Sequence, residues 1–268
     1  MNRLMCSRSR DIMLLQAVLA IIPISMAVGQ GAAYSGKDSA SAGAVIAHAS
    51  RLLGASLVPK GEALSDQTRV EIIRAVDSTT PFVAENINEK PVVLVSAPRV
   101  TIKPDRTICR DLTEAQFNVE VYFDSTSQKL LKIVLRSDSY DPSKIKKAQY
   151  LDADQQMNRT EHYHGLPDQE PLANLAQAMT GLSSCPLLAT EIVAVYTMQT
   201  NVLYRDGKAH PSWYIFLYGS EAFGHGARLD APLHMRNYFV YLVDAETGTC
   251  LIGTNVPAPD QGRYEIKR

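Results

Sequence analysis

The chain has 268 residues, of which 46% are hydrophobic and 21% are charged, and its formal net charge is −1. A chain of this length can bury a hydrophobic core, either in one large domain or in two small ones. The near balance of charge, without a basic patch, argues against nucleic acid as a partner.

The N-terminus has the pattern of an export signal. Arg3, Arg8 and Arg10 precede an apolar run from Ile12 to Val28, which ends in the small residues Ala27-Val28-Gly29. A positive start, an apolar middle and a small-residue exit are typical of a secretory signal peptide. We therefore expect residues 1–29 to be a signal peptide and the mature protein to be secreted or periplasmic. The alternative is that the segment is retained as an N-terminal anchor.

Export limits the chemistry of the mature chain. Removing residues 1–29 takes away three Arg and one Asp, which changes the net charge from −1 to −3. The sequence has no second long apolar segment, so we expect no integral membrane span after cleavage. Three cysteines remain in an oxidising compartment, and we favour a disulfide between Cys185 and Cys250, because both lie in the C-terminal half. Alternatively, Cys109, Cys185 and Cys250 are all buried as small hydrophobic side chains.

The first half of the mature chain contains helical and then strand patterns. Residues 30–40 are rich in Gly, Ala and Ser and are expected to be a flexible N-terminus. Residues 41–137 are expected to form an N-terminal α+β unit. Its predicted elements are helices at 41–54 and 66–77, an extended segment at 91–103, and a β-hairpin of 117–123 and 131–135 around an Asp124-led turn.

The second half repeats this order. Residues 138–167 are polar and are expected to be a linker. The C-terminal unit spans 168–256, and residues 257–268 are expected to be a tail. Its predicted elements are a helix at 169–180 capped by Asp168 and strands at 192–204, 212–218, 238–243 and 249–254.

These elements predict an α+β fold with antiparallel sheets, each with a helix packed on one face. Two similar units in tandem are one interpretation. Residues 118–133 and 237–252 share a Val-Tyr core, an Asp at the strand end and a following Leu. Such a match indicates a duplication, unless it reflects only the general likeness of two hairpins.

The aromatic strand Pro211-Ser212-Trp213-Tyr214-Ile215-Phe216-Leu217 is followed by Asn237-Tyr238-Phe239-Val240-Tyr241-Leu242-Val243-Asp244-Ala245-Glu246-Thr247-Gly248. On these residues, the segment 211–252 resembles the PepSY and PepSY-like domains. Those domains close with a strand-turn-strand written roughly V-V-x-D-A-x-T-G-x-V. In this turn Gly248 supplies a positive φ, and Asp244 can accept hydrogen bonds from its own turn. The resemblance implies a non-catalytic role, such as restraining a secreted peptidase. Cys250 and the loop 219–232 depart from the family pattern.

Candidates for chemistry are few. His162 and His164 are two positions apart, and Glu161 lies directly before them. On a strand the two histidines would share one face and could hold zinc together with the carboxylate. The alternative is that all three lie in a solvated loop. Ser220, His225, Asp230 and His234 suggest a hydrolase triad, but no G-x-S-x-G motif accompanies them. We predict no catalytic residues and no cofactor.

The best candidates for a binding surface are Trp213, Tyr214, Phe216 and Tyr218. One face of this aromatic strand is expected to pack on a helix, and the other is either an exposed patch or a second core layer. The sequence thus predicts a secreted, non-catalytic module that binds a protein or peptide, and an exposed sheet edge could receive such a peptide. The alternatives are a structural cell-envelope protein that assembles through its aromatic sheet, and a metal-dependent or serine hydrolase.

Overall fold

The computed structural model describes residues 32–33, 39–58, 68–74, 91–104, 109, 112–141, 160–163, 165–201, 203–219 and 238–256. The chain divides into two units, Met1–Gln30 and Gly31–Arg268, and every described residue lies in the second. The predicted signal peptide, residues 1–29, and the predicted tail, residues 257–268, lie outside the described residues.

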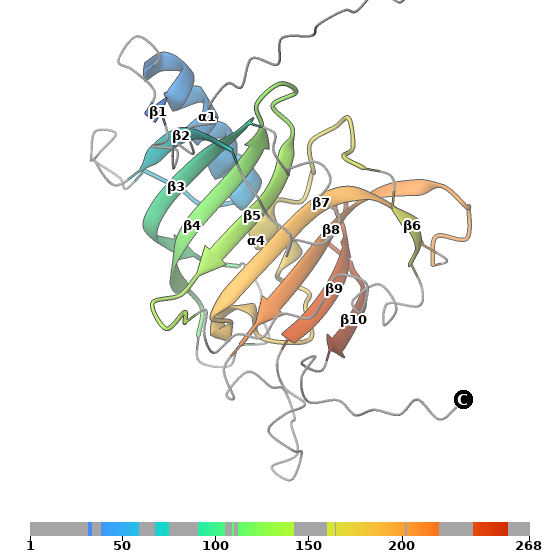
Figure 1. Cartoon of the computed structure of the whole chain (residues 1–268). Coiled ribbons are helices and arrows are strands. Elements are labelled where there is room, and N and C mark those ends of the chain that lie inside the picture. Colours follow the sequence, from blue (N-terminus) through green and yellow to red (C-terminus); the bar gives the residue numbers. More distant parts are fainter. Residues whose placement is uncertain are drawn as a thin grey trace, which may run out of the picture. The chain divides into compact units, whose positions relative to one another are not determined.

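Ten strands form one antiparallel sheet (Figure 1). They are β1 (Ala32–Ala33), β2 (Arg69–Arg74), β3 (Pro91–Ile102), β4 (Ala115–Asp124), β5 (Leu130–Arg136), β6 (Thr160–Tyr163), β7 (Glu191–Asn201), β8 (Ala209–Tyr218), β9 (Tyr238–Asp244) and β10 (Cys250–Val256). Their order across the sheet is β1-β2-β3-β4-β5-β7-β8-β9-β10, and β6 pairs with β7 off this path. Among the described residues, the helical elements are α1 (Ser39–Leu53), the single turn α4 (Leu175–Ala178) and the 3-10 turn η1 (Pro186–Leu188).

The predicted α+β fold with separate sheets, each carrying its own helix, is wrong. Strand β5 pairs with β7, so that Ile133 lies opposite Ala194 and Leu135 opposite Ile192, and the strands of both predicted units form one sheet. Residues 130–135 are all buried, with side chains on both faces of the sheet. A strand that is buried on both faces is stable in the interior of a sheet and not at its edge. In the described part of the chain, α1 is the one helix longer than a single turn.

Of the three predicted helices, one is confirmed, one is much shorter than predicted and one is wrong. The helix expected at 41–54 is confirmed by α1, which ends where Gly54 adopts a φ of 79°. The helix expected at 66–77 is instead strand β2, whose β-branched residues suit a pleated sheet. The segment was predicted as a helix because its short run of apolar residues fits the spacing of either a helix or a strand. The helix expected at 169–180 is only α4, since the side chain of Asn174 caps the helix at that point.

Apolar side chains gather in two core clusters. The larger cluster combines α1, α4 and one set of strand residues, including Leu53, Phe117, Trp213 and Tyr241. The smaller cluster consists of residues of β3, β5, β7, β8 and β9, among them Val134 and Tyr214. Because successive residues of a strand point to opposite faces, the two clusters lie on opposite faces of the sheet.

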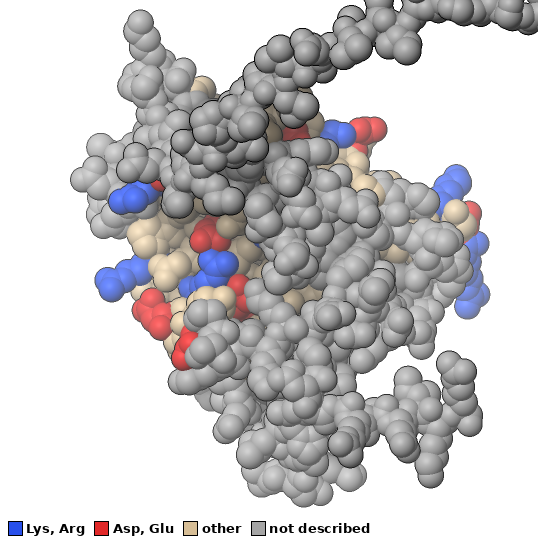
Figure 2. All heavy atoms as spheres, in the orientation of Figure 1, with Lys and Arg blue, Asp and Glu red and all other residues tan. Residues whose placement is uncertain are grey.

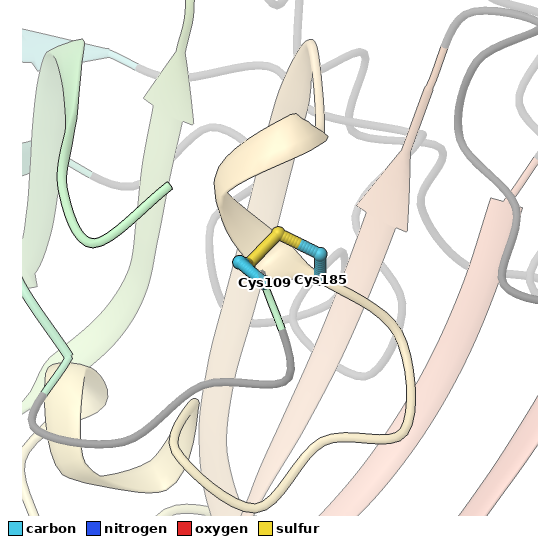
Figure 3. The surroundings of a disulfide bond; sticks show 2 residues. All are labelled: Cys109 and Cys185. Atoms are coloured by element: carbon cyan, nitrogen blue, oxygen red, sulfur yellow. A yellow bond between two sulfur atoms is a disulfide. The ribbon is translucent and has the colours of Figure 1, made fainter. Parts of the chain in front are cut away.

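A disulfide joins Cys109, in the segment after β3, to Cys185, directly before η1 (Figure 3). Their Cα atoms lie 5.1 Å apart, which is ordinary for a disulfide. The predicted pair Cys185–Cys250 is therefore wrong, and Cys250 keeps a free thiol. The location of two cysteines in the same half of the chain did not predict their pairing, because the larger core cluster contains residues of both halves.

Charged side chains meet where the two halves of the sheet join. Arg136 is on β5, and its Nη1 atom lies 2.8 Å from Oε2 of Glu120 on β4. Its Nε atom lies 3.2 Å from Oε1 of the fully buried Glu191 on β7. Tyr122 donates a hydrogen bond to the same Glu120 carboxylate, at 2.8 Å. Figure 2 shows acidic and basic side chains side by side over this part of the sheet. Arg136 thus pairs with one carboxylate from each of the two strands that flank β5.

Candidate functional site

A cavity of about 360 Å³ lies between α1, the β4–β5 turn and the segment that leads to α4. Helix α1 contributes His48 and Leu52, and the turn contributes residues 127–130. Residues 166–171 form the opposite wall, and Tyr196 of β7 completes the lining. The cavity thus draws on parts of the chain that are far apart in sequence.

Hydrogen bonds hold the walls of this cavity in place. In the β4–β5 turn, Oδ1 of Asp124 accepts from the backbone N–H groups of Thr126 and Ser127, at 2.9 and 2.7 Å. The Tyr196 hydroxyl donates to the carbonyl of Gln169 at 2.7 Å, which ties the opposite wall to β7. An Asp at the start of a turn fixes the turn through its own side chain, so the sequence determines the turn locally.

The charged groups of the cavity are paired across it. Lys129 Nζ lies 2.6 Å from Asp168 Oδ1, and the hydrogen bond and charge of Lys129 hold the pKa of Asp168 below its usual range. Asp168, predicted as a helix cap, thus pairs across the cavity. Glu170 faces two bases: His48 Nε2 lies 2.7 Å from one carboxylate oxygen, and Arg51 Nη2 lies 3.8 Å from the other.

His48 is the least exposed of these groups. Its side chain is 23% exposed, and its ring packs against Phe123 with the centroids 5.1 Å apart. Its Nε2 atom is buried, and the short contact with Glu170 lacks the alignment of a hydrogen bond. A ligand that displaced Glu170 could therefore form a hydrogen bond with Nε2 of His48.

The chemistry of the cavity suits binding. Ser127, the one hydroxyl nucleophile in the lining besides the phenol of Tyr196, donates its proton to Asp124 at 3.0 Å. The same Asp124 oxygen accepts from the backbone N–H groups of Thr126 and Ser127, so this hydroxyl is part of the hydrogen-bonded turn. Apolar side chains of Leu52 and Leu130 lie beside the ion pairs. Apolar walls with a few convergent polar groups are typical of ligand pockets.

The aromatic residues that the sequence singled out are core residues. Trp213, Tyr214, Phe216 and Tyr218 are each at most 2% exposed. Trp213 belongs to the larger core cluster and the other three to the smaller one. Their burial contradicts the interpretation of an exposed patch.

The other predicted sites can be placed only in part. His162 lies on β6, whose backbone pairs with β7, while its side chain and all of His164 lie outside the described residues. Residues 220–237, which contain the suggested hydrolase triad, also lie outside them. Among the residues that the structure describes, no group of three or more His, Cys, Asp or Glu could hold a metal ion.

No protein-family model, curated protein or solved structure matches this chain. The resemblance of residues 211–252 to PepSY domains therefore stays a prediction. Two of its physical expectations are confirmed: Gly248 has a φ of 73°, and Asp244 accepts from the N–H groups of Glu246 and Thr247. In the described part of the chain, no helix is long and apolar enough to span a membrane.

Sequence reasoning missed the residues of the cavity. His48, Lys129 and Glu170 belong to three separate segments, and no motif spacing connects them. The only local signal was the Asp124-led turn, which predicts where Lys129 lies but not what faces it. Strand β5, which follows the turn with Lys129, pairs with β7, and Tyr196 of β7 holds the segment next to Glu170.

Proposed function

We propose that this chain is a non-catalytic binding module that acts outside the cytoplasmic membrane and receives a protein or peptide at the His48 cavity. The observation that carries this proposal is the lining itself. The ion pair of Lys129 with Asp168 and the contact of His48 with Glu170 lie beside the apolar side chains of Leu52 and Leu130. Such a mixture recognises a side chain that has both an apolar stem and a polar end.

The size of the cavity supports a peptide or protein partner. A volume of about 360 Å³ is at the low end of the range for small-molecule pockets. It accommodates one or two side chains of a partner whose remaining contacts lie on the surrounding surface. Asp168 is 97% exposed and Glu170 is 56% exposed, so both carboxylates can turn toward an arriving partner.

A secreted peptidase is the partner that we propose first. This choice follows from the export signal and from what the PepSY resemblance implies. A structural role through an exposed aromatic sheet receives no support from the described residues, because the four aromatic side chains are buried. A serine hydrolase gains no support from Ser127, because Asp124, which accepts its hydroxyl, also accepts from two backbone N–H groups and so belongs to the turn.

The proposal is tested by capture of a partner and by its dependence on the cavity. The mature chain is immobilised and exposed to the proteins that are secreted with it, and a captured protein is measured for direct binding. Glu170→Arg should weaken that binding at least tenfold, because it reverses a charge that faces His48 and Arg51. Lys208→Glu, at an exposed residue of the β7–β8 turn, is the matched control and should bind as the wild type does. Capture that Glu170→Arg leaves unchanged would contradict the proposal, as would the absence of any captured protein.

A further inference from the structure

The two edges of the sheet differ in their chemistry. One edge is formed by the two-residue strand β1 and by β2, whose sequence Arg-Val-Glu-Ile-Ile-Arg contains three charged residues. The other edge is β10, in which Cys250–Val256 include no charged residue and no proline. Among the described strands, only β9 pairs with β10, which lies at the end of the sheet (Figure 1).

The β10 edge lacks the usual protection of an edge strand. Unpaired N–H and C=O groups at an edge accept a further strand, and proteins prevent this with short edge strands, charged side chains or bulges. The β1–β2 edge is both short and charged. In β10 there is a bulge between Cys250 and Ile252, but residues 252–256 after it lie opposite residues 242–238 in unbroken register. This stretch of β10 is therefore open to pairing with another strand.

Strand β5 shows what an edge of this construction binds. The β4–β5 and β9–β10 turns are alike, because Oδ1 of Asp124 and Oδ1 of Asp244 each accept from the N–H groups two and three residues later. Both hairpins have a bulge at the same distance after that Asp, with Leu131 and Leu251 as the extra residues. In β5, residues 133–136 directly after the bulge pair with the antiparallel strand β7. The corresponding stretch of β10 has no such strand beside it among the described elements.

The exposure of the two strands differs accordingly. Residues 131–133 of β5 are buried, whereas at the corresponding positions of β10 Leu251 and Ile252 are half-buried and Gly253 is exposed. On its inner side β10 is closely packed, since a Cβ atom at Gly253 would lie 2.5 Å from Cε1 of Tyr241 on β9. Strand β10 is thus held against β9, and its outer edge presents half-buried apolar residues.

We propose that two copies of this chain form a dimer by antiparallel pairing of their β10 edges, with Thr254 opposite Thr254 of the second copy. This pairing places Ile252 opposite Val256 of the second copy. β-Branched residues and pairs of threonines suit opposite positions on neighbouring strands, and the absence of charge from β10 avoids like-charge repulsion across the dimer axis. The edge is therefore complementary to itself. The dimer does not rest on the proposed function, because β10 contributes no residue to the His48 cavity.

The chain itself selects this register. A centre at Thr254 uses residues 252–256, all of which are regularly paired with β9 on their other side. A centre one residue later would include Pro257, which has no N–H, and a centre one residue earlier would include the bulge at Leu251. A centre between two residues would bring opposite faces of the two sheets to the same side, because residues opposite each other share a face.

This pairing gives a closed dimer and not a filament. Each copy uses the same edge about a twofold axis, and the charged β2 edge stays at the outside of the joined sheet. A ladder of a few residues buries less surface than a permanent interface does. We therefore expect monomer and dimer to be in equilibrium.

Sedimentation equilibrium of the mature chain, from about 1 μM to about 1 mM, measures this dimer. Thr254→Lys places two like charges opposite each other and should raise the dissociation constant at least tenfold. Ile72→Lys is the matched control, because it adds the same charge at an exposed residue of the β2 edge, and it should dimerise as the wild type does. Circular dichroism checks that both variants are folded.

Cross-linking tests the register. In a Cys250→Ala background, Thr254→Cys places two thiols opposite each other, so that oxidised glutathione should link the two copies by a disulfide. Asn255→Cys in the same background is the control, since its two thiols lie two positions out of register. We expect the Asn255→Cys variant to cross-link at least tenfold more slowly.

Three results would overturn the inference: a wild type that stays monomeric over this range, a dimer that Thr254→Lys leaves unchanged, or equal cross-linking of the two cysteine variants. If the wild type were monomeric and Thr254→Lys abolished the binding of a captured protein, the β10 edge would receive a strand of that protein. A second copy would then be excluded as its occupant.

Discussion

Asp244 shows how one buried carboxylate organises the end of the sheet. It is 7% exposed and accepts from the Tyr204 hydroxyl and from the N–H groups of Glu246 and Thr247. Burial acts to raise the pKa of Asp244, but these donors outweigh burial and hold the pKa below its ordinary value. Tyr204 also stacks on His210, with ring centroids 3.8 Å apart, so it fixes the β7–β8 loop against the β9–β10 turn.

Tyr204→Phe should therefore destabilise the protein in a pH-dependent way. A carboxylate whose pKa is lower in the folded than in the unfolded chain stabilises the fold above about pH 4, and this stabilisation is lost as the pH falls through the folded pKa. Loss of a hydrogen bond to a charged group should cost about 2 kcal/mol at neutral pH and less near pH 2. Urea unfolding at both pH values measures this loss in the free energy of unfolding. The control is Tyr140→Phe, because the Tyr140 hydroxyl has no partner among the described residues. An equal cost at both pH values would contradict the account.

At the scale of elements, the end of α1 meets the start of α4. Gly54 has a φ of 79° and terminates α1, with its N–H 2.9 Å from the carbonyl of Ser50. A Cβ atom at Gly54 would lie 2.4 Å from Oδ1 of Asn174, the side chain that caps α4. One glycine therefore permits both the positive φ and the close approach of the two helices.

Gly54→Ala should destabilise the protein by at least about 2 kcal/mol. The change places an alanine in the left-handed region and pushes Asn174 from its capping position. Gly43→Ala is a control of opposite sign, because Gly43 lies within α1 and a Cβ atom there would meet nothing within 4 Å. We expect that variant to be stabilised by about 0.5–1 kcal/mol. Chemical denaturation compares the two, and a neutral Gly54→Ala would show that the helix contact is loose.

The sequence predicted those elements whose structure is determined by residues close together in the chain. Helix α1 and the β4–β5 hairpin were predicted because their apolar spacing is unambiguous, and the Gly248 turn because few residues adopt its φ. Strand β2 was mistaken for a helix, because Val70 and Ile73 fit either spacing. Leu172 lies in the segment predicted as the helix 169–180, but it is exposed, and the N–H of the next residue, Ala173, donates to the Ala245 carbonyl instead of to a helical carbonyl.

At the scale of the whole unit, the single sheet and the cavity depend on contacts between distant segments. The one sequence signal for the joined sheet was β5, whose residues 130–135 are apolar on both faces except for Lys132. Such a run indicates an interior strand, but it does not say which strand lies beside it. The charged cavity has no such signal, since its residues come from α1, a turn and the segment before α4.

The Cys109–Cys185 bond should add substantially to the stability of this joined unit. It closes a loop across a sequence separation of 76 residues, which restricts the unfolded chain. Replacing both cysteines by Ser should lower the free energy of unfolding by about 4 kcal/mol, and a reductant should destabilise the wild type similarly. Cys250→Ala, which removes the free thiol, should change stability by less than about 1 kcal/mol and should keep the sensitivity to reductant. Unfolding curves that do not respond to reductant would contradict this pairing.

The central claim is that a protein or peptide partner binds at the His48 cavity, on the face formed by the β4–β5 turn and the segment before α4. Hydrogen exchange of the mature chain, alone and saturated with its captured partner, tests this claim most directly. We predict slower amide exchange at residues 124–130 and 165–173 in the complex, and unchanged exchange at the β7–β8 turn, residues 203–208. Protection at other segments, with none at 124–130 or 165–173, would contradict the claim.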